Sequence, residues 1–302
     1  MTNNTITAIK GIRVGHYTDS SAMTGCTAVL FDDGAVAGVD VRGSAPGTRE
    51  TDLLHGCNAV KKINCIMLSG GSAFGLDAAS GAMEYLEKQG KGVDTGYAKV
   101  PIVPSAVIYD LGVGSASVRP NKENGLFACE NASSDIVAKG AVGAATGATL
   151  GKGFGQEFAY KSGIGSACIE LKGGVKVAAL IIVNALGDVY DPDNGKLLAA
   201  AKINGNFMPC FDPQLMEKAA FGNTTIGVVA TNAELNREEA NKLASMAHDG
   251  LAMTIKPVHT MLDGDTVFGA STCEIKGYPL MPLLVAAVKA TSMAVIDAVK
   301  NI

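Results

Sequence analysis

The chain has 302 residues, of which 47% are hydrophobic, and a mean hydropathy of +0.22, so it can bury a large core and is not an intrinsically disordered protein. Its net charge of −4 offers no polyanion-binding surface, and no cluster of Lys and Arg with aromatic residues occurs, so nucleic acid is not an expected partner. Gly is frequent, with 37 residues, and Trp is absent, which favours close packing of small residues in layers.

At the amino terminus, residues 1–7 contain no basic stretch followed by an apolar segment, so no signal peptide is predicted. Apolar runs such as residues 177–183 are too short to cross a bilayer. We therefore expect a cytoplasmic protein with no membrane partner. No long linker, low-complexity tract or repeat divides the chain, which predicts a single domain over residues 1–302.

The first predicted element is a hairpin, because the apolar runs 27–31 and 35–41 flank an Asp-Gly turn. Residues 66–68 are expected to form a buried strand and residues 76–88 a helix that Gly90 ends. Further strands are predicted at 175–183, 225–230 and 266–271, and further helices at 134–140, 232–249 and 281–299. Helices mixed with hairpin-type strands indicate an α/β protein with a layered sheet core, and not a regular βαβ repeat.

A glycine-rich stretch at residues 68–76 follows a strand and opens a helix, as phosphate-binding loops do. It lacks the Lys-Ser/Thr ending of a P-loop and the first Gly-x-Gly of a dinucleotide site. Ser72 stands in no Gly-x-Ser-x-Gly frame, so a serine-hydrolase elbow is not predicted. The alternative is that these glycines permit close packing of a helix on the sheet.

The pair Asn223-Thr224 is a candidate cleavage site, since it lies between Gly222 and an apolar run. Cutting this bond would give Thr224 both a hydroxyl nucleophile and a free α-amine, whose pKa of about 7.7–8.0 suits a general base. The alternative, and the commoner use of such a stretch, is that Thr224 and Thr225 simply begin a buried strand.

Asp263 and Asp265 point to the same side if the backbone is extended, and their like charges could raise the pKa of one carboxyl. The alternative is a solvated Asp-Gly turn. Asn184 ends an apolar strand, where it could donate to an oxyanion or cap a turn. Tyr109 offers a phenol donor or simple packing, and Lys152, between two glycines, is a mobile surface charge or a cation held over a site.

Taken together, these features resemble the self-processing aminopeptidases and amidases of peptidase family S58, which include L-aminopeptidase D-Ala-esterase/amidase, the β-peptidyl aminopeptidases and the nylon-oligomer hydrolases. The resemblance covers nearly the whole chain. It rests on residues 11–16 (Gly-Ile-Arg-Val-Gly-His), 42–50 (Arg-Gly-Ser-Ala-Pro-Gly-Thr-Arg-Glu), 68–76, 100–104 (Val-Pro-Ile-Val-Pro), 223–225, 228–233 and 263–268 (Asp-Gly-Asp-Thr-Val-Phe).

The resemblance implies an αββα layered sandwich, similar to N-terminal nucleophile hydrolases and, in topology, to ornithine acetyltransferases. It implies a precursor that cuts itself into an α chain of residues 1–223 and a β chain of residues 224–302, and homo-oligomers of such αβ units. No cofactor is implied. The roles carried over are Thr224 as nucleophile, Asn184 as oxyanion donor, Tyr109 and Lys152 as polar groups near the reacting carbonyl, and Asp263 and Asp265 as the acidic pair that orients the nucleophile and its amine.

The family pattern also bears on the substrate. Thr224 with two aspartates is closer to the nylon-oligomer hydrolases than to the aminopeptidases, which tend to have Ser and a Ser-x-Glu pair. Aminopeptidase members have a glutamate shortly before the tyrosine that helps hold the substrate's amine, whereas Val107 and Ile108 stand there in this chain. We therefore expect a hydrolase of short peptides, amino-acid amides or ω-amino acid oligomers. An uncharged neighbourhood suits an amine that lies further away, and Asp263 or Asp265 are the remaining acidic candidates for binding it.

Two other functions stay open. An acyltransferase of the ornithine acetyltransferase type would share the fold and the Thr nucleophile but would pass the acyl group to an amine. An uncleaved, non-catalytic small-molecule binding protein would use Thr224 only as a strand residue.

The cysteines and histidines predict neither disulfides nor a metal site. The seven cysteines include no Cys-x-x-Cys pair, which indicates reduced thiols. The four histidines show no metal-ligand spacing, so no metal is predicted.

Overall fold

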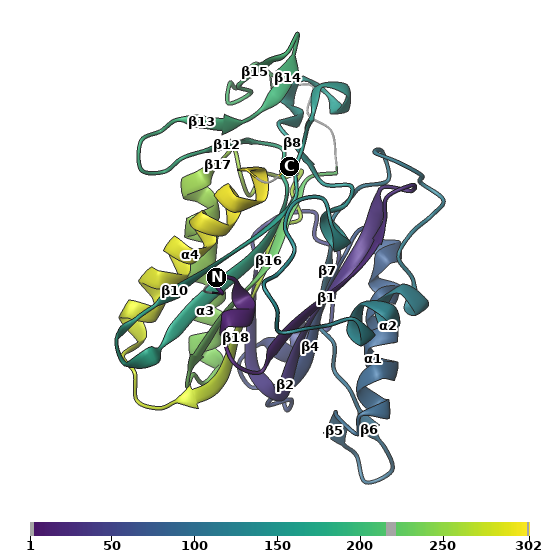
Figure 1. The fold of residues 1–302 in the computed structure, drawn as a ribbon, viewed down its shortest axis with the longest axis vertical. Coiled ribbons are helices and arrows are strands. Elements are labelled where there is room, and N and C mark those ends of the chain that lie inside the picture. Colours follow the sequence, from purple (N-terminus) through teal and green to yellow (C-terminus); the bar gives the residue numbers. More distant parts are fainter. Residues whose placement is uncertain (1–2, 216–221, 301) are drawn as a thin grey trace.

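The computed structural model describes residues 3–215, 222–300 and 302, and its main sheet has nine strands in the order β10-β11-β16-β18-β2-β4-β7-β3, with β1 paired to β2 (Figure 1). These strands are β1 (Ile12–Asp19), β2 (Thr24–Val41), β3 (Thr48–Arg49), β4 (Ile63–Ser69), β7 (Ser105–Val107), β10 (Ile164–Glu170), β11 (Lys176–Asn184), β16 (Thr224–Ala233) and β18 (Thr266–Ile275). The α-helices are α1 (Ala78–Lys88), α2 (Lys122–Glu130), α3 (Arg237–Thr254) and α4 (Leu280–Lys300). Smaller sheets pair β5 (Val93–Asp94) with β6 (Lys99–Val100), β8 (Thr149–Leu150) with β9 (Tyr160–Lys161), β14 (Ala201–Ile203) with β15 (Asn206–Met208), and β12 (Asp188–Tyr190) with both β13 (Leu197–Ala199) and β17 (Ile255–Lys256).

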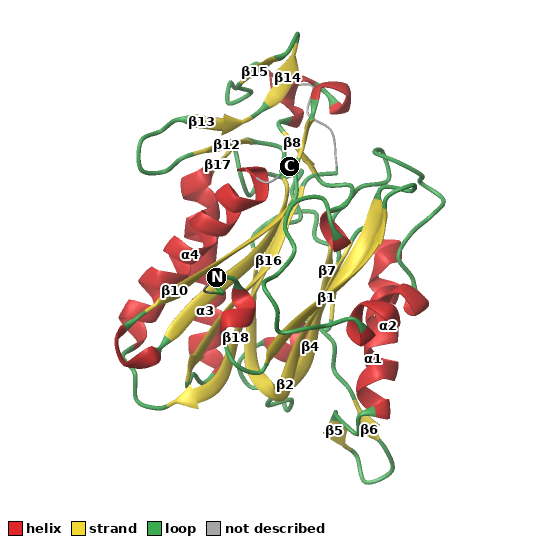
Figure 2. Cartoon of the chain, viewed as in Figure 1, coloured by secondary structure: helices red, strands yellow, loops and turns green. Residues whose placement is uncertain are grey.

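The long strand β2 divides the main sheet into two layers, because its first half pairs with β1 and β4 and its second half with β18. Helices α3 and α4 pack on the layer of β10, β11, β16 and β18, and α1 and α2 pack on the other layer (Figure 2). One apolar core lies between the two sheet layers and includes Phe31 and Phe268. A further core lies under helices α3 and α4, and another lies under helices α1 and α2. The αββα sandwich expected from the sequence is therefore confirmed.

The predicted hairpin at 27–31 and 35–41 is wrong, since both runs belong to the single strand β2. Gly34 has a φ of 75°, and the pairing of β2 with β4 shifts register between Leu30 and Ala35. An Asp-Gly sequence suits a bulge as well as a turn, and a bulge lets one strand bend and continue. Here it carries β2 from one sheet layer to the other.

The predicted helix at 134–140 is also wrong. This segment is irregular, and its ends are held by isolated bridges between Ser133 and Val14 and between Gly140 and Ile164. Between these ends, the side chains of Thr5 and Thr7 bind its backbone. Contacts with distant parts of the chain therefore override a weak local helical pattern.

The other predicted helices lie close to their expected places. Residues 76–88 form the end of a 3-10 helix (Ser72–Asp77) followed by α1, and Gly90, with a φ of 67°, ends it as predicted. The helix expected from 232 begins only at Arg237, because Asn236 and Glu239 form a capping box there while β16 still runs to Ala233. The predicted helix 281–299 corresponds to α4.

Helix α4 is, by length and composition, apolar enough to cross a membrane, but 61% of its most apolar window is buried inside the molecule. It packs on β10, β11 and α3, as a core helix of the sandwich does.

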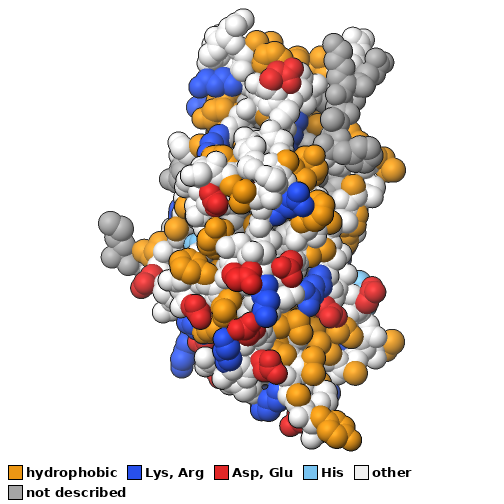
Figure 3. All heavy atoms as spheres, turned by 90° about the vertical axis from the view of Figure 1, so that its right-hand side faces the viewer, with side chains coloured by type: hydrophobic (Ala, Val, Ile, Leu, Met, Phe, Trp, Pro, Cys, Tyr) orange, Lys and Arg blue, Asp and Glu red, His pale blue; other side chains and the backbone are white. Residues whose placement is uncertain are grey.

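On the opposite side of the molecule, acidic and basic side chains are interspersed on the surface over α1 and α2 (Figure 3). There Glu84 pairs with Lys88 at 2.6 Å and with Lys122 at 2.8 Å.

Candidate active site

The sheet topology brings the predicted polar residues to one place. Strand β11 runs antiparallel to β16, with Asn184 opposite Thr224, and β16 runs parallel to β18, with Ile226 opposite Thr266. The end of β11 and the beginnings of β16 and β18 therefore meet at one edge of the layer. Asn184, Thr224 and the aspartates before β18 lie there for this reason.

The bond between Asn223 and Thr224 is buried at this edge, with Thr224 only 4% exposed. The Thr224 hydroxyl makes a short contact with the carbonyl oxygen of Asn223, and that oxygen also accepts the N–H of Gly264 at 2.9 Å. A Cβ added to Gly264 would lie 3.0 Å from Oγ1 of Thr224 and 2.7 Å from the carbonyl oxygen of Ala45. The nucleophile candidate thus faces a carbonyl that is already polarised by a backbone donor, and a glycine leaves room for it.

Lys152 and Asn184 form a buried pair beside this bond. The Lys152 Nζ donates at 3.0 Å to three oxygens, namely the carbonyl and Oδ1 of Asn184 and the carbonyl of Gly222. The Asn184 Nδ2 donates to the same Gly222 carbonyl at 3.1 Å and to the Tyr109 carbonyl at 3.1 Å. Burial lowers the pKa of Lys152 to about 7, against the opposing influence of Asp263 and Asp110. In the uncut chain, these donors therefore bind the carbonyl one residue before the candidate scissile bond.

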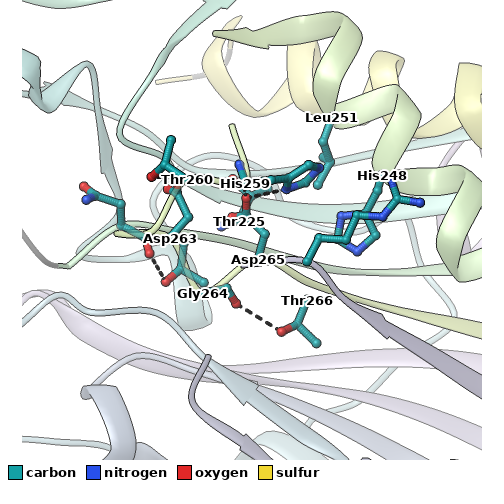
Figure 4. Close-up of polar contacts among 12 residues, drawn as sticks. Thr225, His248, Leu251, His259, Thr260, Asp263, Gly264, Asp265 and Thr266 are labelled. Atoms are coloured by element: carbon teal, nitrogen blue, oxygen red, sulfur yellow. Dashed lines mark hydrogen bonds and ion pairs between the residues drawn. The ribbon is translucent and has the colours of Figure 1, made fainter. Parts of the chain in front are cut away.

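Asp263 and Asp265 are both buried, so the alternative of a solvated turn is wrong. Asp263 accepts the N–H of Thr260 at 2.8 Å and its hydroxyl at 2.5 Å, and burial together with the charge of Asp265 raises the pKa of Asp263 to about 6. Asp265 accepts the N–H of Thr225 at 2.5 Å. Asp265 thus contacts the strand of Thr224 directly, whereas the carboxylate of Asp263 is held by Thr260 (Figure 4).

His259 was not among the predicted residues, although its Nδ1 lies 2.7 Å from Oδ2 of Asp265. A single histidine six residues before an aspartate carries no metal-ligand spacing and no other local signal of a functional role. A neutral or charged imidazole can instead serve as a donor to a carboxylate. Within the described ranges, no group of three His, Cys, Asp or Glu side chains could hold a metal ion.

A cavity of about 200 Å³ opens beside Thr224, and the side chains that line it are uncharged. Tyr109, which is 43% exposed, lies at this cavity, and its ring is so close to Gly222 that a Cβ there would lie 2.8 Å from it. The lining residues are Ala45, Pro46, Gly47, Ser72, Ala73, Val107, Ile108, Tyr109, Gly222, Asn223, Thr224 and Leu262.

The glycine-rich stretch forms part of the cavity wall through close packing. A Cβ on Gly75 would lie 1.8 Å from the carbonyl oxygen of Gly70, and the N–H of Gly71 donates to the buried carboxylate of Asp110 at 2.7 Å. Thr24 donates its hydroxyl to the other oxygen of Asp110, also at 2.7 Å. These contacts support the packing alternative for this stretch.

Known proteins match nearly the whole length of this chain. The family described as peptidase family S58 matches residues 4–301. An uncharacterized aminopeptidase of Mycobacterium tuberculosis is 46% identical over 289 residues, which cover 89% of this chain and 81% of the relative. A 6-aminohexanoate-oligomer endohydrolase of Kocuria sp. is 32% identical over 284 residues, which cover 88% of this chain and 74% of the relative.

Solved structures share the fold. The PH0078 protein of Pyrococcus horikoshii has a TM-score of 0.73 at 26% identity, covering 98% of this chain and 86% of that one. The L-aminopeptidase D-Ala-esterase/amidase of Ochrobactrum anthropi, described as a variant of the Ntn hydrolase fold, has a TM-score of 0.72 at 17% identity, covering 98% of this chain and 85% of that one.

Proposed function

We propose that this chain, which belongs to peptidase family S58 and is a peptidase or amidase, matures by cutting itself between Asn223 and Thr224 and then uses Thr224 as an N-terminal nucleophile. The observation that carries the proposal is the contact of the Thr224 hydroxyl with the Asn223 carbonyl, whose oxygen accepts the Gly264 N–H at 2.9 Å.

Self-cleavage begins when Oγ1 of Thr224 attacks the carbonyl carbon of Asn223. The Gly264 N–H stabilises the negative charge that develops on the carbonyl oxygen. The C–N bond then breaks, the hydroxyl proton passes to the departing nitrogen, and an ester joins Asn223 to Oγ1. Water hydrolyses this ester and leaves Asn223 with a carboxylate and Thr224 with a free amine and its hydroxyl.

In the mature enzyme, the α-amine of Thr224 takes the proton of its own hydroxyl, which attacks the substrate carbonyl to form an acyl-enzyme. Gly222 then lies next to a free chain end, so its carbonyl can leave Lys152 and Asn184. The substrate's carbonyl oxygen can take its place between these two donors. The substrate's C–N bond then breaks, and the amine product leaves with the proton that the Thr224 amine took from the hydroxyl. Water hydrolyses the remaining acyl-enzyme, which releases the carboxylic acid and restores the Thr224 hydroxyl.

The cavity favours an uncharged acyl group. No carboxylate lies among its described lining residues, and Val107 and Ile108 form part of its wall, so a substrate amine close to the scissile carbonyl would have no counter-charge there. The first substrate of the site, its own chain, also carries an amide and not a free amine before Asn223. We therefore propose amides with a distant or blocked amine, such as short ω-amino acid oligomers, as substrates. A panel of matched free and N-acylated amides tests this preference.

The intact mass of the purified protein tests the mechanism. Two co-eluting chains, the smaller beginning at Thr224, are expected, together with a single inactive chain for Thr224→Ala. A wild-type chain that stays whole and cleaves no amide would contradict the proposal and favour the binding-protein alternative. Preferred transfer of the acyl group to an added amine over water would favour the acyltransferase.

A further inference from the structure

The carboxylate of Asp265 is fully buried and bridges two segments of the chain. Its Oδ1 accepts the N–H of Thr225, at the start of β16, at 2.5 Å. Its Oδ2 accepts both the backbone N–H of His259 at 3.0 Å and the ring Nδ1–H of the same residue at 2.7 Å (Figure 4). Each oxygen of this carboxylate therefore has a donor, and His259 supplies two of the three.

The ring of His259 is itself held in place. Its backbone adopts the left-handed conformation, with a φ of 58°, which turns the residue back toward Asp265. Its ring packs edge-to-face against that of His248 in α3, with centroids 4.8 Å apart and an interplanar angle of 69°. This packing limits rotation of the imidazole and keeps Nδ1 directed at the carboxylate.

His248 adds no positive charge beside His259. Burial lowers the pKa of His248 to about 4, so its ring is neutral near neutral pH. Its Nε2 lies 2.9 Å from the carbonyl oxygen of Asp40, which can only accept, so this nitrogen carries the ring proton. His248 is thus a neutral ring that is hydrogen-bonded to β2 and packs against His259, and His259 is the residue that contacts Asp265.

We propose that His259 is a positioning residue, which fixes the Asp265 carboxylate against the peptide unit that joins Thr224 to Thr225 and thereby sets the orientation of the nucleophile. The proposal rests on the proposed function of Thr224. The N–H that Asp265 binds belongs to the same planar peptide as the carbonyl group of Thr224. Holding that plane restricts rotation of Thr224, and the direction of its amine and hydroxyl depends on this rotation.

The physical reason for a histidine lies in the burial of the carboxylate. A buried charge without enough donors is costly and moves toward its protonated form. Loss of the Nδ1–H donor would leave Oδ2 with the His259 backbone N–H alone and would free the carboxylate to turn away from Thr225. The structure would remain, but Thr224 would be placed less accurately.

Two variants distinguish the role of the Nδ1–H donor from that of the left-handed backbone conformation of His259. His259→Gly keeps the left-handed conformation and removes the ring, whereas His259→Asn tolerates that conformation and presents an amide N–H near the position of Nδ1. We expect the Gly variant to cut itself about 10- to 100-fold more slowly than wild type, as for loss of a hydrogen bond to a charged group. Its kcat should fall by a similar factor with KM little changed, and the Asn variant should recover most of both.

Mass spectrometry of the chain during cell-free synthesis gives the rate of self-cleavage. Steady-state hydrolysis of one amide gives kcat and KM. Near-wild-type cutting and kcat in His259→Gly would overturn the inference. Equal losses in both variants would also overturn it, because the ring packing and not the donor would then matter. If His259→Gly does not fold, His259→Asn decides alone, since a folded but inactive Asn variant contradicts the role of the donor. A wild-type chain that is never cut refutes the self-processing function instead.

Discussion

The Nζ of Lys152 lies 3.0 Å from Oδ1 of Asn184, and both side chains donate to the carbonyl oxygen of Gly222. The three acceptors around Nζ match the three N–H bonds of an ammonium group. Burial nevertheless lowers the pKa of Lys152 to about 7. The contacts with the backbone and with one amide side chain therefore hold Nζ in place, while burial leaves Lys152 only partly protonated near neutral pH.

Replacing Lys152 with Met should flatten the pH dependence of the unfolding free energy between about 7 and 10.5. In this window the unfolded chain holds a proton on Lys152 that the folded chain has released, so Lys152 makes stability rise with pH. Urea unfolding at both ends of the window measures the slope, with Thr224→Ala in both proteins to keep the chain uncut. Equal slopes with and without Lys152 would contradict the lowered pKa.

Gly264→Ala should block self-cleavage. The new Cβ would lie 3.0 Å from Oγ1 of Thr224 and 2.7 Å from the Ala45 carbonyl oxygen, so either the nucleophile or the Gly264 N–H has to move. Gly112→Ala is the matched control, because a Cβ at Gly112 meets nothing within 4 Å. Intact mass is expected to show an uncut chain for Gly264→Ala and normal cutting for the control. Normal cutting by both would exclude Gly264 from the site.

The kcat of the mature enzyme should fall as the pH drops through about 6, where Asp263 becomes protonated. Burial and the charge of Asp265 raise this pKa. Asp263→Asn keeps the shape and cannot ionise, so its pH profile should lose this acid limb and have a lower plateau. An unchanged limb in the variant would assign it to another group.

Thr225→Val should cut itself normally, whereas Thr224→Val should not cut at all. The Thr225 hydroxyl oxygen is buried and has no hydrogen-bond partner among the described residues. Replacing it with a methyl group removes a desolvated polar group, which should leave stability unchanged or raise it by about 1 kcal/mol. Mass and thermal unfolding of the two variants check this. Failure of Thr225→Val to cut, with Thr224→Val cutting, would show that the wrong hydroxyl was chosen.

Much of the fold could be predicted from local patterns. Strands β11, β16 and β18 and helix α4 lie within a few residues of their expected ranges, because long apolar runs leave few alternatives. The hairpin at 27–41 could not be resolved locally, since the same Asp-Gly sequence serves a turn or a bulge. The choice depends on β18 and β4, which pair with β2 from distant parts of the chain.

The candidate site was predictable to the extent that its residues stand at strand ends. Asn184 and Asp265 were proposed for that reason or from the family pattern, and the structure places them beside Thr224 and Thr225. The donor arrangement was not predictable. Lys152 and Asn184 hold the Gly222 carbonyl, and the Gly264 N–H holds the Asn223 carbonyl. These contacts depend on backbone positions that no side-chain pattern encodes.

The strand order has a consequence for the lifetime of the molecule. Strands β16 and β18 would belong to the smaller chain after cleavage, yet they lie between β11 and β2 of the larger chain. Neither of the two proposed chains would hold a complete sheet by itself, so folding would have to come before the proposed cut. An enzyme that unfolds afterwards has lost the covalent link that first brought these strands together. Its thermal inactivation should then be irreversible, while the uncut Thr224→Ala chain can refold.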